Sequence, residues 1–276
     1  MTKPSEPILN GRGPARQERG AGTRPRSERL GVWPVRAQGE PLASLLAQRL
    51  DGEAHRPWQR PEPQREQFRE RFAHCSHWVL VMAAGIAVRF LDGFIEDKHR
   101  DPAVVVIDEA GRHAIALLGG HEAGANALAY RVANAVGAVP VVTTATEAGK
   151  PLVAGIGCRK GVGADRIEDC LLHALQGRSL EEVRELVTVD LKAREPGLLE
   201  FSGAHDIPLR VIAREQISAR AWVTEPSDWV RRTLGVQGVC EPCALIASPR
   251  GKLIVPKTCR GGVAVALAAD APWGVS

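Results

Sequence analysis

Short apolar runs alternate along this chain with longer segments in which apolar residues recur every three or four positions. The short runs predict strands at 29–35, 77–84 and 138–146, and the last two have the continuous pattern of strands buried on both faces. The periodic segments predict helices at 41–50, 65–75 and 122–136. Residues 103–120 read as two strands joined by a turn with Asp and Gly, which is typical of a hairpin. We therefore expect an α/β domain with a largely parallel sheet and one hairpin.

A second α/β unit follows a short joint at 148–151. Its pattern predicts helices at 165–175, 195–205 and 241–248, and strands at 152–158, 183–190, 208–213, 252–257 and 262–269. The first strand runs into a glycine-rich turn, and Pro196 stands near a helix start, where a missing N–H costs least. The predicted fold is thus two layered α/β lobes, with domains at 29–149 and 150–276. Residues 1–28 are rich in Pro, Gly and Arg, and we expect a disordered tail there.

Composition narrows the class of protein. The 276 residues are 44% hydrophobic and 25% charged, which suffices for a hydrophobic core in each lobe. A net charge of +4 is too small to indicate nucleic-acid binding, and no apolar run reaches the length of a membrane span. The first thirty residues lack the apolar core of a secretory signal. The six scattered cysteines therefore suggest reduced thiols in a cytoplasmic protein.

The first candidate site is the stretch LLGGHEAGAN, at the end of a predicted strand. Gly119 and Gly120 would let a ligand approach the backbone, and amides of the following helix would bind a carboxylate. His121 would serve as an acid or base near neutral pH, and Asn126 would donate hydrogen bonds. The alternative is a tight turn with an exposed histidine. The local pattern favours that alternative, because the stretch is not a phosphate-binding P-loop.

A second candidate site is the stretch GIGCRKG. Gly155 and Gly157 precede Arg159 and Lys160, two cations that suit a ligand rich in carboxylates. Cys158 between them is read as a buried structural thiol, because no histidine is paired with it in sequence. A structural loop is an equally supported reading of the stretch.

Two glutamates that stand before prolines are candidate acids or bases. Glu195 and Glu241 would act in this way if partly buried, whereas the alternative is a charged residue at each helix start. Cys240 and Cys243 form only half of a zinc site, so we expect no protein metal. Further cations, on a charged stretch that is also readable as a solvated loop, are Arg89 and Lys98.

These motifs together resemble one family, CbiG, the cobalt-precorrin-5A hydrolases of anaerobic cobalamin synthesis. The N-terminal likeness runs through VMAAGIAVR, DKHRDPAVVVIDEAGRHAIALLGGHEAGAN and VPVVTTAT. The C-terminal likeness runs through GIGCRKG, DLKAREPGLLE, GVCEPCAL and VPK, and this part is also similar to CobE of the aerobic pathway. The chain departs from the family pattern at Ala123 and Glu147. It also lacks the variable region that the family usually carries between its two halves.

The resemblance implies a definite reaction. Water opens the ring A δ-lactone of cobalt-precorrin-5A, and a two-carbon fragment leaves as acetaldehyde to give cobalt-precorrin-5B. The substrate carries the cobalt, so no further cofactor is implied. Its carboxylates would meet the cations Arg89, Lys98, Arg159, Lys160 and Lys192, in a cleft between the lobes.

Catalytic roles remain open at this point. His121 or Glu195 would activate water, Glu241 is an alternative acid, and amides at 119–120 or 155–157 would hold the oxyanion.

Two other functions compete with the hydrolase. A non-catalytic corrinoid carrier would use the CobE-like half alone. A nucleotide-binding protein is disfavoured because neither a Walker motif nor G-x-G-x-x-G is present. The expected partner is the cobalt corrinoid, with no nucleic acid or membrane. A homodimer and contacts with other enzymes of the cobalamin pathway are compatible with this reading.

Overall fold

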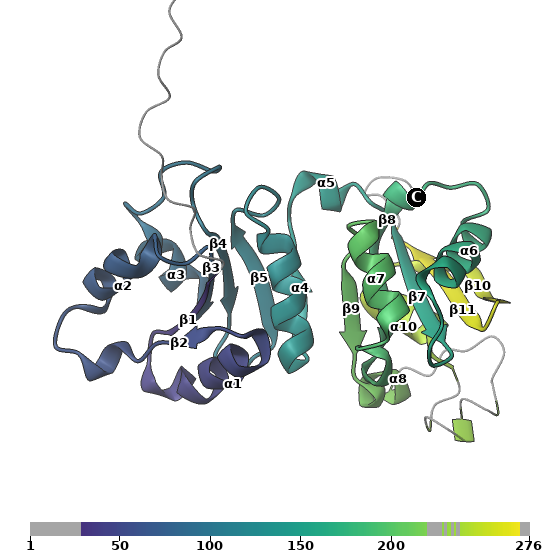
Figure 1. The fold of residues 1–276 in the computed structure, drawn as a ribbon, viewed down its shortest axis with the longest axis horizontal. Coiled ribbons are helices and arrows are strands. Elements are labelled where there is room, and N and C mark those ends of the chain that lie inside the picture. The colour runs from purple at the N-terminus through teal and green to yellow at the C-terminus, as the bar shows by residue number, and fades with distance from the viewer. Residues whose placement is uncertain (1–28, 220–227, 229–230, 233–234, 236–237, 271–276) are drawn as a thin grey trace, which may run out of the picture.

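A computed structural model of the chain describes residues 29–219, 228, 231–232, 235 and 238–270. The predicted disordered tail at 1–28 lies outside the described residues. Two lobes, each with its own sheet, follow one another along the chain (Figure 1). The expected fold of two layered α/β lobes with largely parallel sheets is confirmed. Every helix of the described ranges falls short of the length and apolarity that crossing a bilayer requires.

The N-terminal lobe has a six-stranded sheet in the order β2-β1-β3-β4-β5-β6. Only the β4–β5 pair is antiparallel. Its strands are β1 (Leu30–Pro34), β2 (Glu53–Ala54), β3 (His77–Val81), β4 (Ala103–Ile107), β5 (His113–Leu118) and β6 (Val139–Val141). Its helices are α1 (Glu40–Leu50), α2 (Gln64–Phe72), α3 (Ala84–Leu91), α4 (Ala125–Val136) and α5 (Ala145–Ala148).

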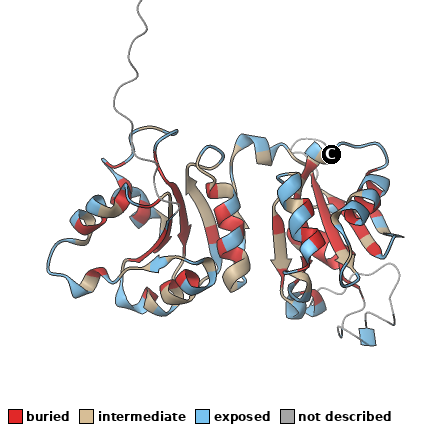
Figure 2. Ribbon diagram, viewed as in Figure 1, coloured by how far each residue is buried: buried red, intermediate tan, exposed pale blue. Residues whose placement is uncertain are grey.

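Helices cover both faces of this sheet, because its inner strands are apolar on both sides. Val79 and Val81 pack with α1 and α4, whereas Trp78 and Leu80 pack with α2 and α3. This alternation is the two-residue period of a strand. Figure 2 shows the buried residues gathered along the strands and on the helix faces turned toward them.

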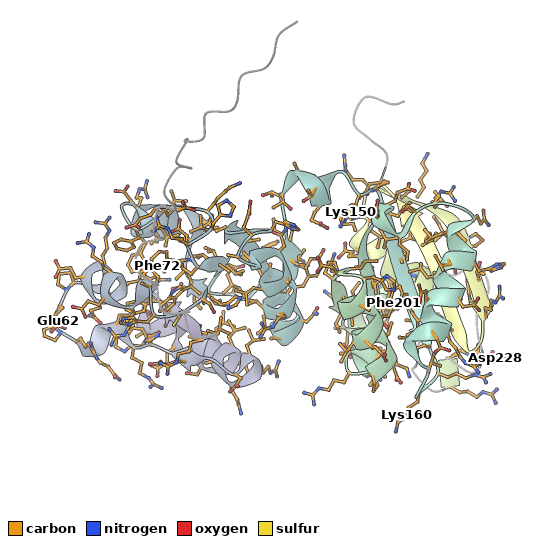
Figure 3. The ribbon with its side chains drawn as sticks, turned by 45° about the horizontal axis from the view of Figure 1, so that its top comes forward. Glu62, Phe72, Lys150, Lys160, Phe201 and Asp228 are labelled. Atoms are coloured by element: carbon orange, nitrogen blue, oxygen red, sulfur yellow. The ribbon has the colours of Figure 1, made fainter. Side chains whose placement is uncertain are left out.

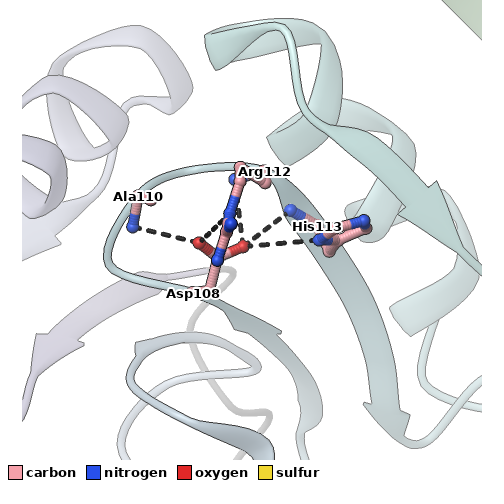
Figure 4. A network of polar contacts seen from close by, with 4 residues as sticks. All are labelled: Asp108, Ala110, Arg112 and His113. Atoms are coloured by element: carbon pink, nitrogen blue, oxygen red, sulfur yellow. Dashed lines mark hydrogen bonds and ion pairs between the residues drawn. The ribbon is translucent and has the colours of Figure 1, made fainter.

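The predicted hairpin is confirmed, and Asp108 holds its turn. The Asp108 carboxylate accepts hydrogen bonds from the backbone N–H groups of Ala110, Arg112 and His113, at 3.0, 3.0 and 2.9 Å (Figure 4). Gly111 supplies the positive φ of 68° that the turn requires. Burial raises the pKa of Asp108, but these hydrogen bonds lower it more, so the pKa lies below its usual value.

The predicted buried strand at 138–146 is wrong in extent and burial. Strand β6 covers only Val139–Val141 at the sheet edge, and Val139 is 38% exposed. Pro140 has no N–H to donate, and prolines in sheets are confined to such edge positions. The TTAT segment after β6 leads instead into α5.

The C-terminal lobe has a five-stranded sheet in the order β10-β11-β7-β8-β9. Strands β7, β8 and β9 are parallel, and β11 is antiparallel to both of its neighbours. Its strands are β7 (Leu152–Cys158), β8 (Val183–Val189), β9 (Leu209–Ile212), β10 (Lys252–Arg260) and β11 (Val263–Ala269). Its described helices are α6 (Ala164–Leu175), α7 (Pro196–Ala204), α8 (Arg214–Ala219) and α10 (Cys240–Ala247). Helices α6 and α7 pack on one face of the sheet, and α8 and α10 pack on the other.

One asparagine links the two lobes through the edge strand β9, which lies beside α4 (Figure 1). The Asn134 amide donates to the carbonyl of Leu209 at 2.7 Å and accepts from the N–H of Val211 at 2.9 Å. The side chain thus pairs with the backbone of β9 as a neighbouring strand would.

Replacing Asn134 by alanine is expected to loosen this link. The change leaves two backbone groups of β9 without their partner, so we expect a loss of about 1–2 kcal/mol in unfolding free energy. Amide hydrogen exchange at Val211 should speed up, as followed by NMR. The matched control is Gln48→Ala, an exposed position on α1. Unchanged protection of Val211 in Asn134→Ala would contradict the link.

Candidate functional site

The β5–α4 loop is a tightly closed turn. The Gly119 carbonyl accepts from the N–H groups of Ala123 and Ala125 at 3.1 and 3.0 Å, and the Gly120 carbonyl accepts from that of Asn126 at 3.0 Å. A Cβ on Gly119 would lie 2.7 Å from that of Ala123, so glycine is required there. The first amides of α4 are therefore occupied within the loop, and a carboxylate would have to find other donors.

Asn126 and Lys98 fix the surroundings of this loop. Asn126 donates to the Thr144 hydroxyl at 3.0 Å, which ties the loop to the TTAT segment. Lys98 lies 3.4 Å from the Glu122 carboxylate, and His121 beside it is exposed. The structure thus groups Lys98, Gly119, Gly120, His121 and Asn126 at one end of the N-terminal lobe. Arg89 is exposed on the last turn of α3.

Glu195 is held by contacts to both of its carboxylate oxygens. Its side chain is 7% exposed, Oε1 accepts from the Gly161 N–H at 2.5 Å, and Oε2 lies 3.0 Å from Lys192 Nζ. Burial raises the pKa of Glu195, but the Gly161 N–H and Lys192 lower it further than burial raises it, so the pKa lies below its usual value. Glu195 is therefore a carboxylate at neutral pH, with Lys192 held beside it.

Gly155 and Gly157 lie inside β7, so the predicted glycine-rich turn begins later, at Arg159. A Cβ on Gly155 would come within 1.8 Å of the Cys240 carbonyl oxygen, because α10 crosses the strand at this point. Gly155 also pairs with Ala266 of β11 and Val187 of β8. Glycine at this position allows α10 to pack closely against the sheet. The role of this segment in holding an oxyanion stays a prediction.

The other predicted residues of this lobe lie around the same strand end. Arg159 and Lys160 are exposed in the turn after β7. Glu241 is the second residue of α10, is 1% exposed, and its carboxylate accepts from the N–H of Lys257 at 3.0 Å. Lys160 and Lys192 both act electrostatically on Glu195. The carboxyl ends of β7 and β8 thus gather the cations and Glu195 where ligands of parallel sheets bind.

Three buried or half-buried cysteines of this lobe, Cys158, Cys240 and Cys243, are protonated thiols. Burial raises the pKa of Cys158, and it raises that of Cys240 to about 12. Burial also places the pKa of Cys243 well above its usual value. A thiol that stays protonated is a poor nucleophile, which supports the structural reading of Cys158.

The structure does not bring the two glycine stretches together. The β5–α4 loop contacts Thr144, just before α5 and the start of β7, whereas Arg159 and Lys160 follow the far end of β7. Seven strand residues span about 20 Å. Figure 3 shows Lys150 and Lys160 at opposite ends of the C-terminal lobe. The predicted residues therefore form two separate groups.

A cavity of about 930 Å³ lies between the lobes, lined by α1, α4, α7 and β9. Its wall carries three arginines and several apolar side chains, among them Arg49, Arg131, Arg194, Leu45, Leu199 and Leu209. Ala193 and Arg194 line the cavity, and their neighbours in the sequence are Lys192 and Glu195. Sequence reasoning missed these residues, because they come from α1, α4, α7, β9 and the segment before α7 and share no motif.

A buried polar pair lies at this interface. Tyr130 of α4 lines the cavity and hydrogen bonds the Glu185 carboxyl of β8. Burial raises the pKa of both groups. The Arg184 guanidinium, 3.5 Å from the Glu185 carboxyl, opposes this shift at Glu185, so the contact between the lobes lies beside a largely buried ion pair.

Comparison with known proteins identifies the family. Residues 66–147 match the model described as cobalamin synthesis G N-terminal, and residues 152–268 match cobalamin synthesis G C-terminus. The chain belongs to the cobalamin synthesis G family. The two matched parts correspond to the two lobes and are only a few residues apart, at the joint between α5 and β7.

Curated relatives agree with this family. A protein of Salmonella typhimurium named cobalt-precorrin-5A hydrolase is 26% identical, over 72% of this chain and 83% of its own length. A Priestia megaterium protein of the same name is 23% identical, over 69% of this chain and 77% of its own. Protein CobE of Sinorhizobium sp is 30% identical, over 46% of this chain and 84% of its own. The alignment with the Salmonella protein runs over 293 positions, more than this whole chain, so that relative carries residues that this chain lacks.

Proposed function

We propose that this protein is a cobalt-precorrin-5A hydrolase of cobalamin biosynthesis. The observation that carries the proposal is the presence of both family parts, in order, on one chain. The relatives named cobalt-precorrin-5A hydrolase align across both lobes, whereas CobE accounts for less than half of the chain. A carrier role alone would leave the N-terminal lobe unexplained. As the sequence predicts, we expect the enzyme to act in the cytoplasm.

The proposed reaction sets clear physical demands. Water adds to the ring A δ-lactone carbonyl, and opening the ring frees an alcohol and a carboxylate. Loss of the alcohol proton then breaks a carbon–carbon bond and releases acetaldehyde, while the macrocycle accepts the electron pair. The enzyme must supply a base for water and donors for the oxyanion. Cobalt enters as part of the substrate.

The cavity between the lobes is our proposed substrate site. Its volume of about 930 Å³ lies within the usual range for ligand sites. Guanidinium groups of Arg49, Arg131 and Arg194 would pair with the peripheral carboxylates, and the leucines would face the ring. Arg89, Arg159 and Lys160 do not line this cavity, so the proposal does not use them as substrate-binding groups, although Lys160 acts electrostatically on Glu195.

Glu195 is our proposed water-activating group among the three candidates. It directly follows Arg194, which lines the cavity, and it is ionised at neutral pH. His121 lies in the β5–α4 loop, in the group of residues on the N-terminal lobe. Glu241 is buried against the backbone of β10. Lys192, held 3.0 Å from Glu195, would stabilise the developing negative charge.

A direct assay tests the function. The purified protein is incubated with cobalt-precorrin-5A, and released acetaldehyde is trapped and quantified. Release in proportion to substrate consumed supports the hydrolase. Binding without release would favour the CobE-like carrier, and absence of both would reject the two functions together.

Arginine substitutions test the site. Arg131→Ala and Arg194→Ala are each expected to raise KM about tenfold with little change in kcat, because each removes a charge-assisted contact to a substrate carboxylate. Steady-state acetaldehyde release measures both parameters. The matched control is Lys252→Ala, an exposed cation on β10 in the other half of the C-terminal lobe. Equal KM values for the arginine variants and this control would place the substrate elsewhere.

A further inference from the structure

A second cavity lies in the N-terminal lobe, between β1, β2 and α2. Its volume is about 340 Å³, and its wall consists of Trp33, Glu53, Ala54, His55, Arg56, Pro57, Gln59, Arg60, Gln67 and Arg71. Figure 1 shows β2 and α2 on the side of this lobe that faces away from the C-terminal lobe. The β2–α2 cavity is therefore separate from the cavity between the lobes.

Two buried nitrogen atoms in the wall lack hydrogen-bond partners. Trp33 is 1% exposed, and the side chain of His55 is 10% exposed. Neither Trp33 Nε1 nor His55 Nε2 has a partner within the described part of the chain. The two rings lie 5.3 Å apart, so both atoms belong to one aromatic wall. Each of the two nitrogen atoms has less than 1 Å² of accessible surface, so both lie behind the wall of the cavity and the two rings form a closed aromatic backing to it.

The wall also carries an excess of positive charge. Arg60 and Arg71 form no ion pair with a carboxylate of the described residues, whereas Arg56 is paired with Glu40. The only acid in the wall is Glu53, whose side chain is 71% exposed and whose carboxylate lies 3.8 Å from His55 Nδ1.

The neighbouring charges also affect the protonation of the His55 imidazole. Burial lowers the pKa of His55; Glu53 raises it, and Arg71 and Arg60 lower it further. The imidazole is therefore neutral at pH 7. In its Nε2–H tautomer it carries a neutral N–H without a partner, as the Trp33 indole does.

We propose that the β2–α2 cavity binds a small organic anion through a carboxylate or phosphate group. Arg60 and Arg71 supply charge-assisted hydrogen bonds, and the buried rings of Trp33 and His55 form the aromatic backing of the site. The planar guanidinium groups match either kind of oxyanion in geometry. The cavity is at the small end of ligand sites, which favours a compact metabolite over a macrocycle. The proposal is independent of the hydrolase activity.

Titration of the full chain with citrate and with inorganic phosphate, at constant ionic strength, tests the site. Indole N–H resonances report on Trp33, with Trp33→Phe identifying its signal, and thermal melting reports on binding by mass action. We expect a saturable shift of the Trp33 signal and a rise in Tm with at least one anion. A response to citrate alone identifies a carboxylate ligand, and a response to phosphate alone identifies a phosphate ligand.

Charge variants separate this site from nonspecific anion effects. Arg60→Gln and Arg71→Gln are each expected to weaken binding about tenfold or more, since each removes a charged donor. Lys252→Gln, an exposed cation of the other lobe, should bind as the unaltered protein does. Two arginine positions are tested so that one misfolded variant leaves the other informative. Two outcomes would overturn the proposal and mean that only water fills the cavity. One is a lack of response to both anions, and the other is binding by both arginine variants as tight as that of the unaltered protein.

Discussion

Replacing Gly155 by alanine is expected to destabilise the C-terminal lobe by about 3 kcal/mol. The added Cβ would lie 1.8 Å from the carbonyl oxygen of Cys240, 2.8 Å from its carbonyl carbon and 2.9 Å from the nitrogen of Ala244. All three atoms belong to the backbone of α10, which cannot rotate away as a side chain can. Since β7 is paired with strands on both sides, the strand cannot yield either.

Urea unfolding followed by circular dichroism measures this effect. Gly203→Ala is the matched control, because Gly203 lies in α7 and a Cβ there would meet nothing within 4 Å. Alanine is the better helix former, so the control should be stabilised by about 0.5–1 kcal/mol. If Gly155→Ala were as stable as the unaltered protein, the close approach of α10 to β7 would be wrong.

Replacing Glu195 by glutamine is expected to lower kcat for acetaldehyde release about a hundredfold or more. The amide keeps the shape of the side chain and still accepts the Gly161 N–H, but it loses the negative charge beside Lys192. The proposed base is then absent while the loop keeps its anchor. A fall in kcat with an unaltered fold therefore distinguishes catalysis from support of the loop.

Three comparisons complete this test. Glu200→Gln, an exposed position on α7, is the matched control and should keep full activity. His121→Ala and Glu241→Gln examine the two alternatives, and a larger kcat loss in either than in Glu195→Gln would transfer the role. Full activity in a folded Glu195→Gln variant would remove Glu195 from the mechanism.

The pH profile follows from the same contacts. The pKa of Glu195 is lowered, so its charged form is present throughout the neutral range and is lost only as pH falls through that lowered value. The acid limb of kcat/KM assigned to this group should therefore lie below 4.5, the ordinary pKa of a glutamate. Stability contributed by the Glu195–Lys192 pair should disappear over the same acidic range.

Much of the fold followed from local pattern. The hairpin between β4 and β5 was predictable because Asp108 and Gly111 are residues that such a turn requires. The buried strands β3 and β7 were predictable from their continuous apolar runs. The strand at 138–146 was overestimated, since the apolar run did not reveal that Pro140 would stand at a sheet edge.

The sequence by itself determined the types of element, their order and the family, because periodicity and extended motifs are local properties of the chain. Only the tertiary structure decided which residues meet. Gly155 looked like part of a ligand loop, and the packing of α10 makes it a contact between helix and sheet. The resemblance implied that cations of both lobes meet one substrate in a cleft, but the residues around the two glycine stretches form two separate groups. The cavity between the lobes is formed by α1 and α4 of one lobe and by residues 193–211 of the other, which are far apart in sequence. Contacts between such distant residues depend on the order and direction of the strands, and a local sequence pattern does not encode either.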